Sequence, residues 1–235
     1  MEEITVPRHI GIIMDGNRRF AKKLMMKPWK GHEWGKKKIE DLFEWCKELD
    51  IREVTLYAFS VKNFNRPKDE FDFLMKLFEE TFEELMDEQH KIHKYKIRIN
   101  FIGRIFMFNP RIQELMHKVM EQTKDYKEYT VNFAMAYGGR EEIIDATIKI
   151  AEQVKEGKLD INQINLETFG ENLYMNDDVD MIIRTSGEHR TSDFLPFQGN
   201  YAEWFFIEKH WPEFEKEDFV QLIHEFSNRQ RRFGK

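Results

Sequence analysis

The chain has 235 residues, of which 41% are hydrophobic and 14% aromatic, so it can fill the core of one large α/β domain. Its formal net charge of -6 argues against a general nucleic-acid binder, because no basic excess neutralises a phosphate backbone. The single cysteine, Cys46, excludes a disulfide framework and a cysteine-based zinc site, and neither a signal pattern nor an apolar run of about 20 residues is present. We therefore expect one domain over 1–235, cytoplasmic, without a nucleic-acid partner.

Six short runs of apolar, mostly β-branched or aromatic residues have the character of strands. They lie at 10–14, 54–59, 97–102, 131–136, 181–184 and 204–207. Apolar residues recur at helical spacing between them, which predicts helices around 39–49, 71–86, 112–119 and 143–154. Because strands and helices alternate, we expect an α/β fold with a central, mostly parallel six-stranded sheet flanked by helices. In such sheets ligands bind at the carboxyl ends of the strands.

The first predicted strand ends at a carboxylate, a turn and a cluster of cations, in the segment DGNRRFAKK over residues 15–23. Asp-Gly-Asn is turn chemistry, and a helix that starts near Arg18 would point free N–H groups at the same place, where a phosphate fits. The lone acid Asp15 indicates Mg²⁺, which is commonly held by one or two carboxylates and substrate phosphate oxygens. Glu203, just before the sixth strand, is expected to join Asp15. A strand-to-helix turn with a solvated basic face remains an alternative.

Two further strand ends carry polar loops of the same character. After the second strand comes SVKNFNRP, residues 60–67, in which helix capping explains the last asparagine and the proline but not Asn63 and Arg66. The fifth strand runs into RTSGEHRTSDFLP, residues 184–196, where arginine forks and hydroxyl groups around a glycine suit a diphosphate. Three strand ends of one character favour a ligand site over three unrelated surface loops.

The chain contains many flexible or aromatic apolar side chains, with 12 methionines and 21 phenylalanines. In an enzyme such side chains line a cavity for an apolar ligand, and otherwise they fill the core. Composition alone is compatible with both.

Five motifs, in this order, resemble those of the cis-prenyltransferases of the undecaprenyl diphosphate synthase and dehydrodolichyl diphosphate synthase family. They are HIGIIMDGNRR from residue 9, the block 57–67, YGGR over 137–140, the block 184–192, and YAE over 201–203. The resemblance spans residues 9–234, and its GNRR form is closest to archaeal and eukaryotic-type members.

This resemblance implies a fold with an apolar substrate tunnel and a Mg²⁺-dependent transferase. The enzyme would condense isopentenyl diphosphate with an allylic diphosphate primer, farnesyl or geranylgeranyl diphosphate, and create a cis double bond at each addition. The product would be a polyprenyl diphosphate such as undecaprenyl diphosphate, a precursor of long glycosyl-carrier lipids.

The resemblance also implies roles for individual residues. Asp15 matches the catalytic aspartate, which helps to hold Mg²⁺ and assists departure of the allylic diphosphate, and Glu203 matches the second metal carboxylate. Asn63 matches a residue that assists proton removal from the isopentenyl unit. The residues that match substrate-binding positions are Gly16, Asn17, Arg18, Arg19, Phe20, His32, Ser60, Val61, Lys62, Phe64, Arg66, Arg184, Arg190, Thr191, Ser192, Arg232 and Gly234. The last two belong to an Arg-x-Gly motif that in relatives reaches the partner's substrate across a homodimer.

Two positions depart from the family pattern. Pro28 stands where many bacterial relatives have an arginine, so Lys27 or Lys30 is expected to replace its diphosphate contact. Ala136 stands where an asparagine is common. Product length depends on the closed end of the tunnel, which we expect to be built from the helix at 71–86 and the third and fourth strands.

Two alternatives to chain elongation remain at this point. One is a partner subunit that supports another cis-prenyltransferase, and the other is a short-chain, irregular or different-acceptor prenyl transfer. The intact aspartate loop speaks against the first, and the arginines and serine of the block 184–192 speak against the second. A lipid product also implies peripheral contact with a membrane.

Overall fold

The structure is a computed structural model that describes residues 4–229. Its strands are β1 (His9–Ile13), β2 (Glu53–Ser60), β3 (Ile97–Ile102), β4 (Tyr129–Tyr137), β5 (Met181–Arg184) and β6 (Glu203–Phe206). Its α-helices are α1 (Asn17–Lys23), α2 (Gly31–Glu48), α3 (Lys68–Leu85), α4 (Lys91–Lys94), α5 (Pro110–Thr123), α6 (Gly139–Lys155), α7 (Leu166–Gly170) and α8 (Lys216–Asn228). Its 3-10 helices are η1 (Pro28–Lys30), η2 (Val61–Asn65), η3 (Ile105–Met107), η4 (Ile161–Gln163) and η5 (Trp211–Glu213).

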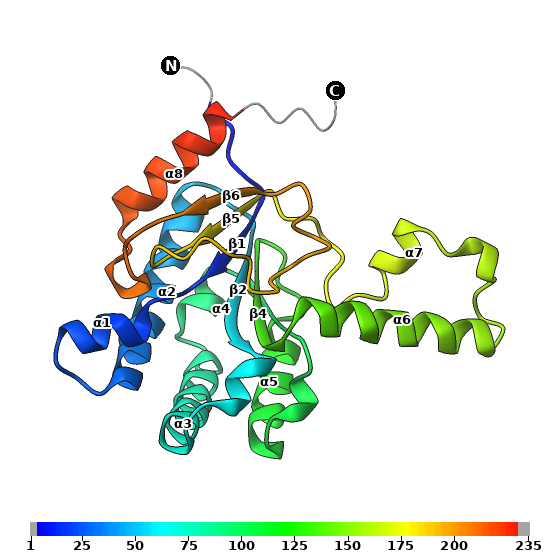
Figure 1. Cartoon of the computed structure of the whole chain (residues 1–235), viewed down its shortest axis with the longest axis horizontal. Coiled ribbons are helices and arrows are strands. Elements are labelled where there is room, and N and C mark those ends of the chain that lie inside the picture. Colours follow the sequence, from blue (N-terminus) through cyan, green and yellow to red (C-terminus); the bar gives the residue numbers. More distant parts are fainter. Residues whose placement is uncertain (1–3, 230–235) are drawn as a thin grey trace.

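The six strands form one sheet in the order β3-β4-β2-β1-β5-β6, and all neighbouring pairs are parallel (Figure 1). Parallel neighbours need long crossover connections, which are mostly helical here, and this explains the alternation of strand and helix patterns in the sequence. The predicted six-stranded α/β fold is confirmed, with strand bounds within two residues of the expected ones. The sheet is wholly rather than mostly parallel.

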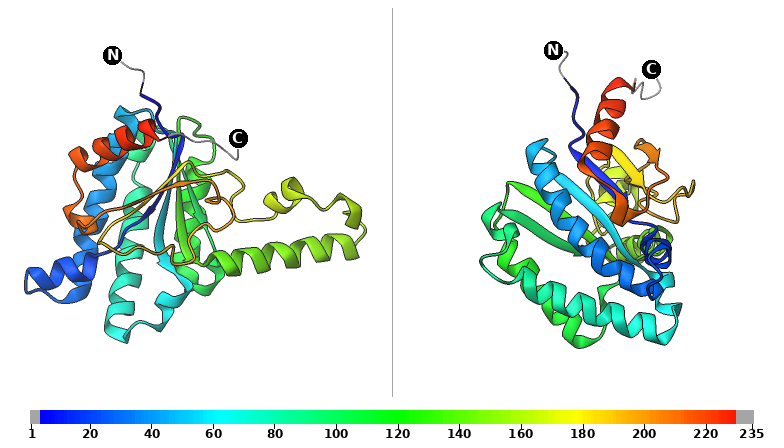
Figure 2. Two further views of the ribbon diagram at one scale, coloured as in Figure 1. Left: turned by 45° about the horizontal axis from the view of Figure 1, so that its top comes forward. Right: turned by 90° about the vertical axis from the view of Figure 1, so that its left-hand side faces the viewer.

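Different segments pack on the two faces of the sheet. Helices α2, α3, α5 and α8 cover one face, where Ile12 of β1 packs in the main core with residues such as Leu42 (Figure 2). Ile13 points to the opposite face, because side chains alternate along a strand. A smaller core there contains Phe194 from the connection between β5 and β6. This packing holds the loop after β5 against the sheet, close to the end of β1.

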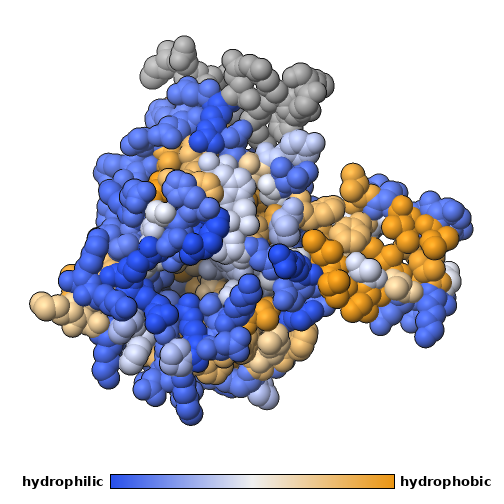
Figure 3. Space-filling model, in the orientation of Figure 1, coloured by the Kyte–Doolittle hydropathy of each residue, from blue (hydrophilic) through white to orange (hydrophobic). Residues whose placement is uncertain are grey.

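Helices α6 and α7 project from one end of the molecule as an arm, residues 139–170 (Figure 1). Buried Glu142 fixes the base of α6, since it accepts hydrogen bonds from Tyr137 Oη at 2.5 Å and Gln198 Nε2 at 2.9 Å. Figure 3 shows that much of the surface of this arm is apolar. Its exposed large apolar residues are Ile144, Ile148, Ile161, Ile164 and Leu166. Within residues 4–229, no helix is both long and apolar enough to cross a bilayer.

Candidate active site

The order of the strands creates a crevice at the carboxyl ends of β1 and β5. From β1 the chain continues to β2 on one side, whereas β5 pairs with β1 on the other side. In open α/β sheets, ligands bind at such a switch point in strand order. Asp15 follows β1 and Arg184 ends β5, and Arg184 Nη2 donates a hydrogen bond to Asp15 Oδ2 at 2.9 Å. The fold therefore brings the first and third predicted loops together.

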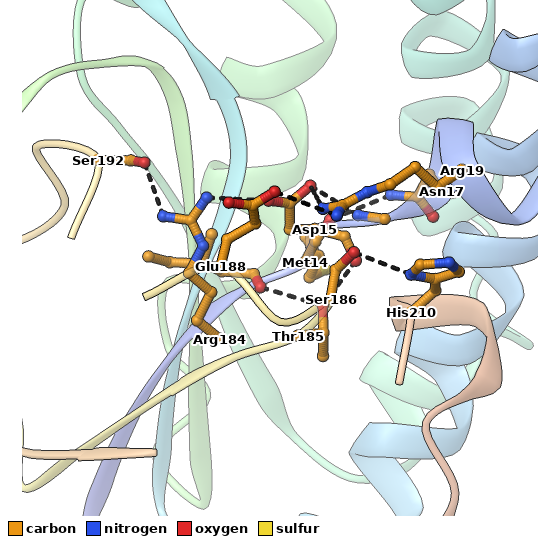
Figure 4. Close-up of polar contacts among 12 residues, drawn as sticks. Met14, Asp15, Asn17, Arg19, Arg184, Thr185, Ser186, Glu188, Ser192 and His210 are labelled. Atoms are coloured by element: carbon orange, nitrogen blue, oxygen red, sulfur yellow. Dashed lines mark hydrogen bonds and ion pairs between the residues drawn. The ribbon is translucent and has the colours of Figure 1, made fainter. Parts of the chain in front are cut away.

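The position of Asp15 is set by its main chain (Figure 4). Its carbonyl oxygen accepts hydrogen bonds from Thr185 Oγ1 at 2.7 Å and from the Trp211 N–H at 2.9 Å. The Gly16 N–H donates to Asp15 Oδ1 at 2.7 Å. Gly16 has a φ of 101°, and a Cβ at this position would lie 2.8 Å from His210 Nδ1. Only glycine fits this turn, so close packing orients the carboxylate.

Arg184 is the central cation of the crevice. Its side chain is buried, and Nη1 donates to Ser192 Oγ at 2.7 Å and to the Arg190 carbonyl at 2.5 Å. Its Nε–H is buried without a hydrogen-bond partner among the described residues. A buried charged donor that lacks a partner is costly, and an anion relieves the cost. An oxygen of a diphosphate meets this requirement.

Glu188 links the two loops across the mouth of the crevice (Figure 4). One carboxylate oxygen accepts from Arg19 Nη1 at 3.1 Å and the other from Arg190 Nη1 at 2.5 Å. Arg19 Nη2 also lies 3.5 Å from Asp15 Oδ1. Positive charge is in excess at this site, which favours an anionic ligand. The charged side chains that line it are five cations, Lys36, Lys62, Arg66, Arg184 and Arg190, and three carboxylates, Asp15, Glu141 and Asp193.

A second polar cluster lies where α2 meets η2 and α3. Arg66 Nη1 donates to the buried Glu70 carboxylate at 2.7 Å and lies 3.3 Å from His32 Nε2. Because arginine only donates, His32 Nε2 accepts, and the imidazole proton is assigned to Nδ1. Burial, together with the cations Arg66 and Arg18, lowers the pKa of His32 to about 3. His32 is therefore an uncharged hydrogen-bonding group at neutral pH.

The loop after β2 is folded by its own capping hydrogen bonds. The Ser60 N–H donates to Asn63 Oδ1 at 3.0 Å, which fixes η2 at the end of the strand. Phe64 packs against Phe59 and Phe108, with ring centroids 5.1 and 5.4 Å apart, so it is a core residue. The loop thus presents its polar side chains while its aromatic one anchors it.

A cavity of about 590 Å³ extends from this polar mouth between the sheet and α3. The predicted site residues that line it are Asp15, Asn17, His32, Ser60, Val61, Lys62, Asn63, Arg66, Arg184, Arg190 and Ser192. Its apolar wall includes Ile39, Leu74, Leu77, Phe78, Phe82, Phe133 and Met135. A cationic mouth joined to an apolar interior fits a ligand with an anionic head and a hydrocarbon tail. Some of the phenylalanines and methionines therefore line the cavity, and others pack in the core.

Several predicted positions do not line this cavity. They are Gly16, Arg18, Arg19, Phe20, Phe64 and Thr191. Lys27 and Lys30 do not line the cavity either: Lys27 Nζ lies over the Trp29 ring, and Lys30 pairs with Glu33 at 2.7 Å. Lys36 of α2 lines the cavity instead. The predicted Arg232 and Gly234 lie outside the described residues.

Glu203 does not lie beside Asp15 of the same chain. The parallel register aligns Glu203 with Met181 and Met181 with Ile10, at the amino ends of their strands, whereas Asp15 follows the carboxyl end of β1. Glu203 Oε2 instead accepts a hydrogen bond from Arg229 Nη1 at 2.7 Å. The expectation that the two carboxylates meet is thus wrong within one chain, because it ignored the direction in which β6 runs.

Comparison with known proteins gives the family. The family described as putative undecaprenyl diphosphate synthase matches residues 13–234. The chain belongs to the cis-prenyltransferases. It is therefore a prenyltransferase of the polyprenyl diphosphate synthase type.

Individual relatives of this cis-prenyltransferase span nearly its whole length. The geranylgeranyl-diphosphate-specific tritrans,polycis-undecaprenyl-diphosphate synthase of Methanopyrus kandleri is 46% identical over 237 residues, covering 100% of this chain and 87% of its own. The synthase of the same name from Thermococcus kodakarensis is 47% identical over 232 residues, covering 98% of this chain and 88% of its own. Lavandulyl diphosphate synthase from Lavandula x intermedia, crystallised with dimethylallyl diphosphate, has a TM-score of 0.91 at 30% identity, covering 98% and 99%. A probable undecaprenyl diphosphate synthase from Campylobacter jejuni has a TM-score of 0.80 at 36% identity and full coverage of both chains.

The site of this cis-prenyltransferase contains residues that the sequence did not single out. Thr185 and Glu188 lie inside a predicted loop, so the motif indicated their region but not their contacts. His210 comes from the connection between β6 and η5, where its Nδ1 lies 2.8 Å from Ser186 Oγ (Figure 4). Burial lowers the pKa of His210. No local pattern marks it, because only the fold brings it behind the Asp15 loop.

The residues at the mouth of the crevice fit a Mg²⁺ ion that is held jointly by a protein carboxylate and the diphosphate of a substrate. Within residues 4–229, no group of three or more His, Cys, Asp or Glu side chains forms a ready-made metal site. Mg²⁺ is typically held by one or two carboxylates together with substrate phosphates and water, and Asp15 offers one such carboxylate. The buried, unpartnered Nε–H of Arg184 places a fitting position for a phosphate oxygen in the same crevice.

Proposed function

We propose that this prenyltransferase elongates an allylic diphosphate by adding isopentenyl diphosphate with new cis double bonds. The observation that carries the proposal is the single cavity that joins a cationic mouth, around Asp15 and Arg184, to an apolar interior. The diphosphates bind at the mouth, and the growing hydrocarbon chain occupies the interior, away from water. The names of the archaeal relatives support this assignment.

The loop after β5 is the proposed isopentenyl diphosphate site. Arg184, Arg190 and Ser192 line the cavity next to one another, and arginine forks match diphosphate oxygens. Asn63 lines the same cavity and is proposed to assist removal of the proton from the condensing unit.

The loop after β1 is the proposed allylic diphosphate site, with Arg66 and neutral His32 on its other side. Asp15 and the diphosphate oxygens would hold Mg²⁺, which neutralises the charge that develops on the departing diphosphate. Arg19, which pairs with Asp15 and Glu188, adds a further cation near this loop.

Geranylgeranyl diphosphate is the proposed primer and an undecaprenyl-type diphosphate the proposed product. The support is the geranylgeranyl-diphosphate specificity in the names of relatives that are 46% and 47% identical over nearly the whole chain. Irregular condensation is a second candidate, because the lavandulyl diphosphate synthase structure has a TM-score of 0.91 to this one.

Incorporation assays distinguish these functions. The purified chain is incubated with Mg²⁺, labelled isopentenyl diphosphate and one primer at a time: dimethylallyl, geranyl, farnesyl or geranylgeranyl diphosphate. A ladder that ends at a long product, strongest with geranylgeranyl diphosphate, supports the proposal. A labelled short product formed from labelled dimethylallyl diphosphate in the absence of isopentenyl diphosphate supports irregular condensation, and no labelled product in either assay contradicts both. Asp15→Asn should lower turnover about 100-fold or more, whereas Asp125→Asn on the surface should not.

We also propose a homodimer in which each chain contributes to its partner's site. The exposed apolar side chains of the arm need a cover, which a second copy supplies. Glu203 lies at the opposite edge of the sheet from Asp15 and pairs with Arg229, three residues before Arg232. Glu203 therefore lies beside Arg229, the last residue that the structure describes, and we propose that Glu203 serves the site of a second chain.

A further inference from the structure

The connection between α1 and α2 exposes an apolar surface of its own. Leu24, Met25, Met26 and Trp34 have exposed fractions of 46%, 96%, 36% and 49%. Met25 lies in left-handed backbone, with a φ of 55°. Trp34 packs edge-on against Phe20 of α1, with ring centroids 5.6 Å apart, which joins the apolar side chains of the two helices. We call these five residues the α1–α2 tip.

Lysines surround the α1–α2 tip, although the whole chain has a net charge of -6. Residues 22–37 include six lysines and one glutamate. Three of these lysines pair with carboxylates. Lys22, Lys27 and Lys37 are exposed and form no ion pair within the part of the chain that the structure describes. Uncompensated positive charge therefore stands beside exposed apolar side chains.

The arm is the other exposed apolar surface, and its charge has the opposite sign. Residues 139–170 include seven acidic and four basic residues. The arm and the α1–α2 tip lie at opposite ends of the longest axis (Figure 1), and apolar atoms protrude at both ends in Figure 3. An anionic surface would attract the tip and repel the arm. The two surfaces thus suit different occupants.

We propose that the α1–α2 tip docks the enzyme on an anionic phospholipid bilayer. Apolar side chains, a tryptophan and flanking lysines are the combination that binds peripheral proteins at such a surface. The tip adjoins the active site, because α1 begins two residues after Asp15 and Lys36 of α2 lines the cavity. Docking would place the mouth of the cavity beside the bilayer.

This position would let a hydrocarbon product pass into lipid without exposing its chain to water. Only that consequence rests on the proposed function, since docking itself needs neither substrate nor turnover.

Vesicle flotation without substrates tests the proposal. One set of vesicles is phosphatidylcholine alone, and the other contains roughly one third phosphatidylglycerol. We expect the protein to float with the anionic vesicles at low salt, and binding to fall about tenfold or more on neutral vesicles or near 1 M salt. Equal binding to both vesicles, or no binding to either, would overturn the proposal.

Variants locate the contact. Met25→Asp should lower anionic-vesicle binding about tenfold, and aspartate tolerates the left-handed backbone at this position. The matched control is Phe106→Asp, at an exposed phenylalanine (69%) outside the lysine-rich segment. The triple change Lys22→Gln, Lys27→Gln and Lys37→Gln should lower binding about tenfold or more. Its charge-matched control changes three other exposed lysines to glutamine: Lys118, Lys124 and Lys127.

The control variants show whether vesicle binding depends on the α1–α2 tip or on the overall charge of the protein. If the control variants lose as much binding as the tip variants, the α1–α2 tip is not the docking surface. An oligonucleotide can be added at the same concentration of negative charge as the anionic lipid. If it releases the protein from the vesicles, the tip is a nucleic-acid site instead, and the proposal is overturned. Prenyl transfer in detergent should be unchanged in Met25→Asp, which separates a failure of docking from a failure of the proposed reaction.

Discussion

At the scale of single residues, the ion pairs of Asp15 define the geometry of the proposed diphosphate site. The carboxylate lies between Arg184, at 2.9 Å, and Arg19, at 3.5 Å. Arg184 uses its two Nη atoms on Asp15, Ser192 and a main-chain carbonyl, and its Nε–H is buried without a partner among the described residues. A fork with several fixed contacts gives the anion site its geometry, and a point charge at the same place would not.

Replacing Arg184 by lysine tests this geometry. Arg184→Lys keeps the charge but removes the fork, so the KM for isopentenyl diphosphate should rise about tenfold or more, from the loss of charge-assisted hydrogen bonds. Steady-state kinetics with varied isopentenyl diphosphate measures the effect. Arg8→Lys, at an arginine that is 72% exposed, is the control and should leave KM unchanged. An unchanged KM in Arg184→Lys would remove Arg184 from the isopentenyl diphosphate site.

His32 should make the protein sensitive to acid. Its pKa is lowered to about 3 in the folded state, so below pH 6.5 the unfolded state binds more protons than the folded state. Stability should therefore fall as the pH drops from about 6.5 toward 3, by up to about 1.4 kcal/mol per pH unit from this group.

Denaturant unfolding at several pH values checks this prediction. His32→Gln keeps an acceptor for Arg66 but does not titrate, so its unfolding free energy should depend less on pH between 6 and 5. Burial also lowers the pKa of His9, which contributes equally to both proteins and cancels in the comparison. Identical slopes for the two proteins would show that His32 titrates normally.

At the scale of elements, α3 connects the polar mouth with the apolar interior. The helix begins just after Arg66, and residues from Leu74 to Phe82 line the cavity along its length. Eight residues of helix span about 12 Å. The expected contribution of this helix and of β4 to the closed end of the tunnel agrees with the lining, through Phe133 and Met135, whereas no residue of β3 lines the cavity.

A larger side chain on the cavity face of α3 should shorten the product. Leu77 is only partly buried and lines the cavity, so in Leu77→Trp the added ring occupies space that a growing chain would use. The first condensation should keep its rate, because the mouth is unchanged. Chromatography of the labelled products gives the chain length. Lys76→Trp places the same ring on the exposed side of α3 and should leave chain length unchanged.

At the scale of the whole molecule, we expect the arm to form the interface of the proposed homodimer. Ile148 and Leu166 are 50% and 79% exposed, and their burial against a second copy would stabilise a dimer. The double change Ile148→Asp and Leu166→Asp should give a monomer by sedimentation velocity, with little loss of unfolding free energy, because both side chains already face water. A dimer of unchanged stability would show that the arm is not the interface.

Mixing two inactive variants tests whether each site uses both chains. Asp15→Ala lacks the carboxylate, and Arg232→Ala lacks the arginine of the Arg-x-Gly motif. If the motif serves the partner, mixed dimers have one complete site each, and random exchange should restore about a quarter of wild-type activity per chain. No recovery after exchange would place both groups in the site of a single chain.

Local sequence patterns predicted much of this molecule. All six strands, their parallel arrangement and the long helices follow from periodicity, which depends on neighbouring residues alone. The loops at Asp15, Asn63 and Arg184 were predicted because polar groups follow buried strands, and all three line one cavity. The residue types in these loops and their positions after strands were sufficient to predict that they bind a ligand.

Other features depended on the path of the chain in space. Glu203 was expected beside Asp15, but the direction of β6 places it at the far edge of the sheet. His210 and Trp211 reach the Asp15 loop from a connection with no motif, and the low pKa of His32 comes from burial that no pattern records. The sequence by itself determined which segments are strands, which are helices and which loops carry the chemistry, because those depend on local periodicity and residue type. Only the tertiary structure decided which loops meet and which residues line the cavity, because strand order and burial arise from packing between distant segments.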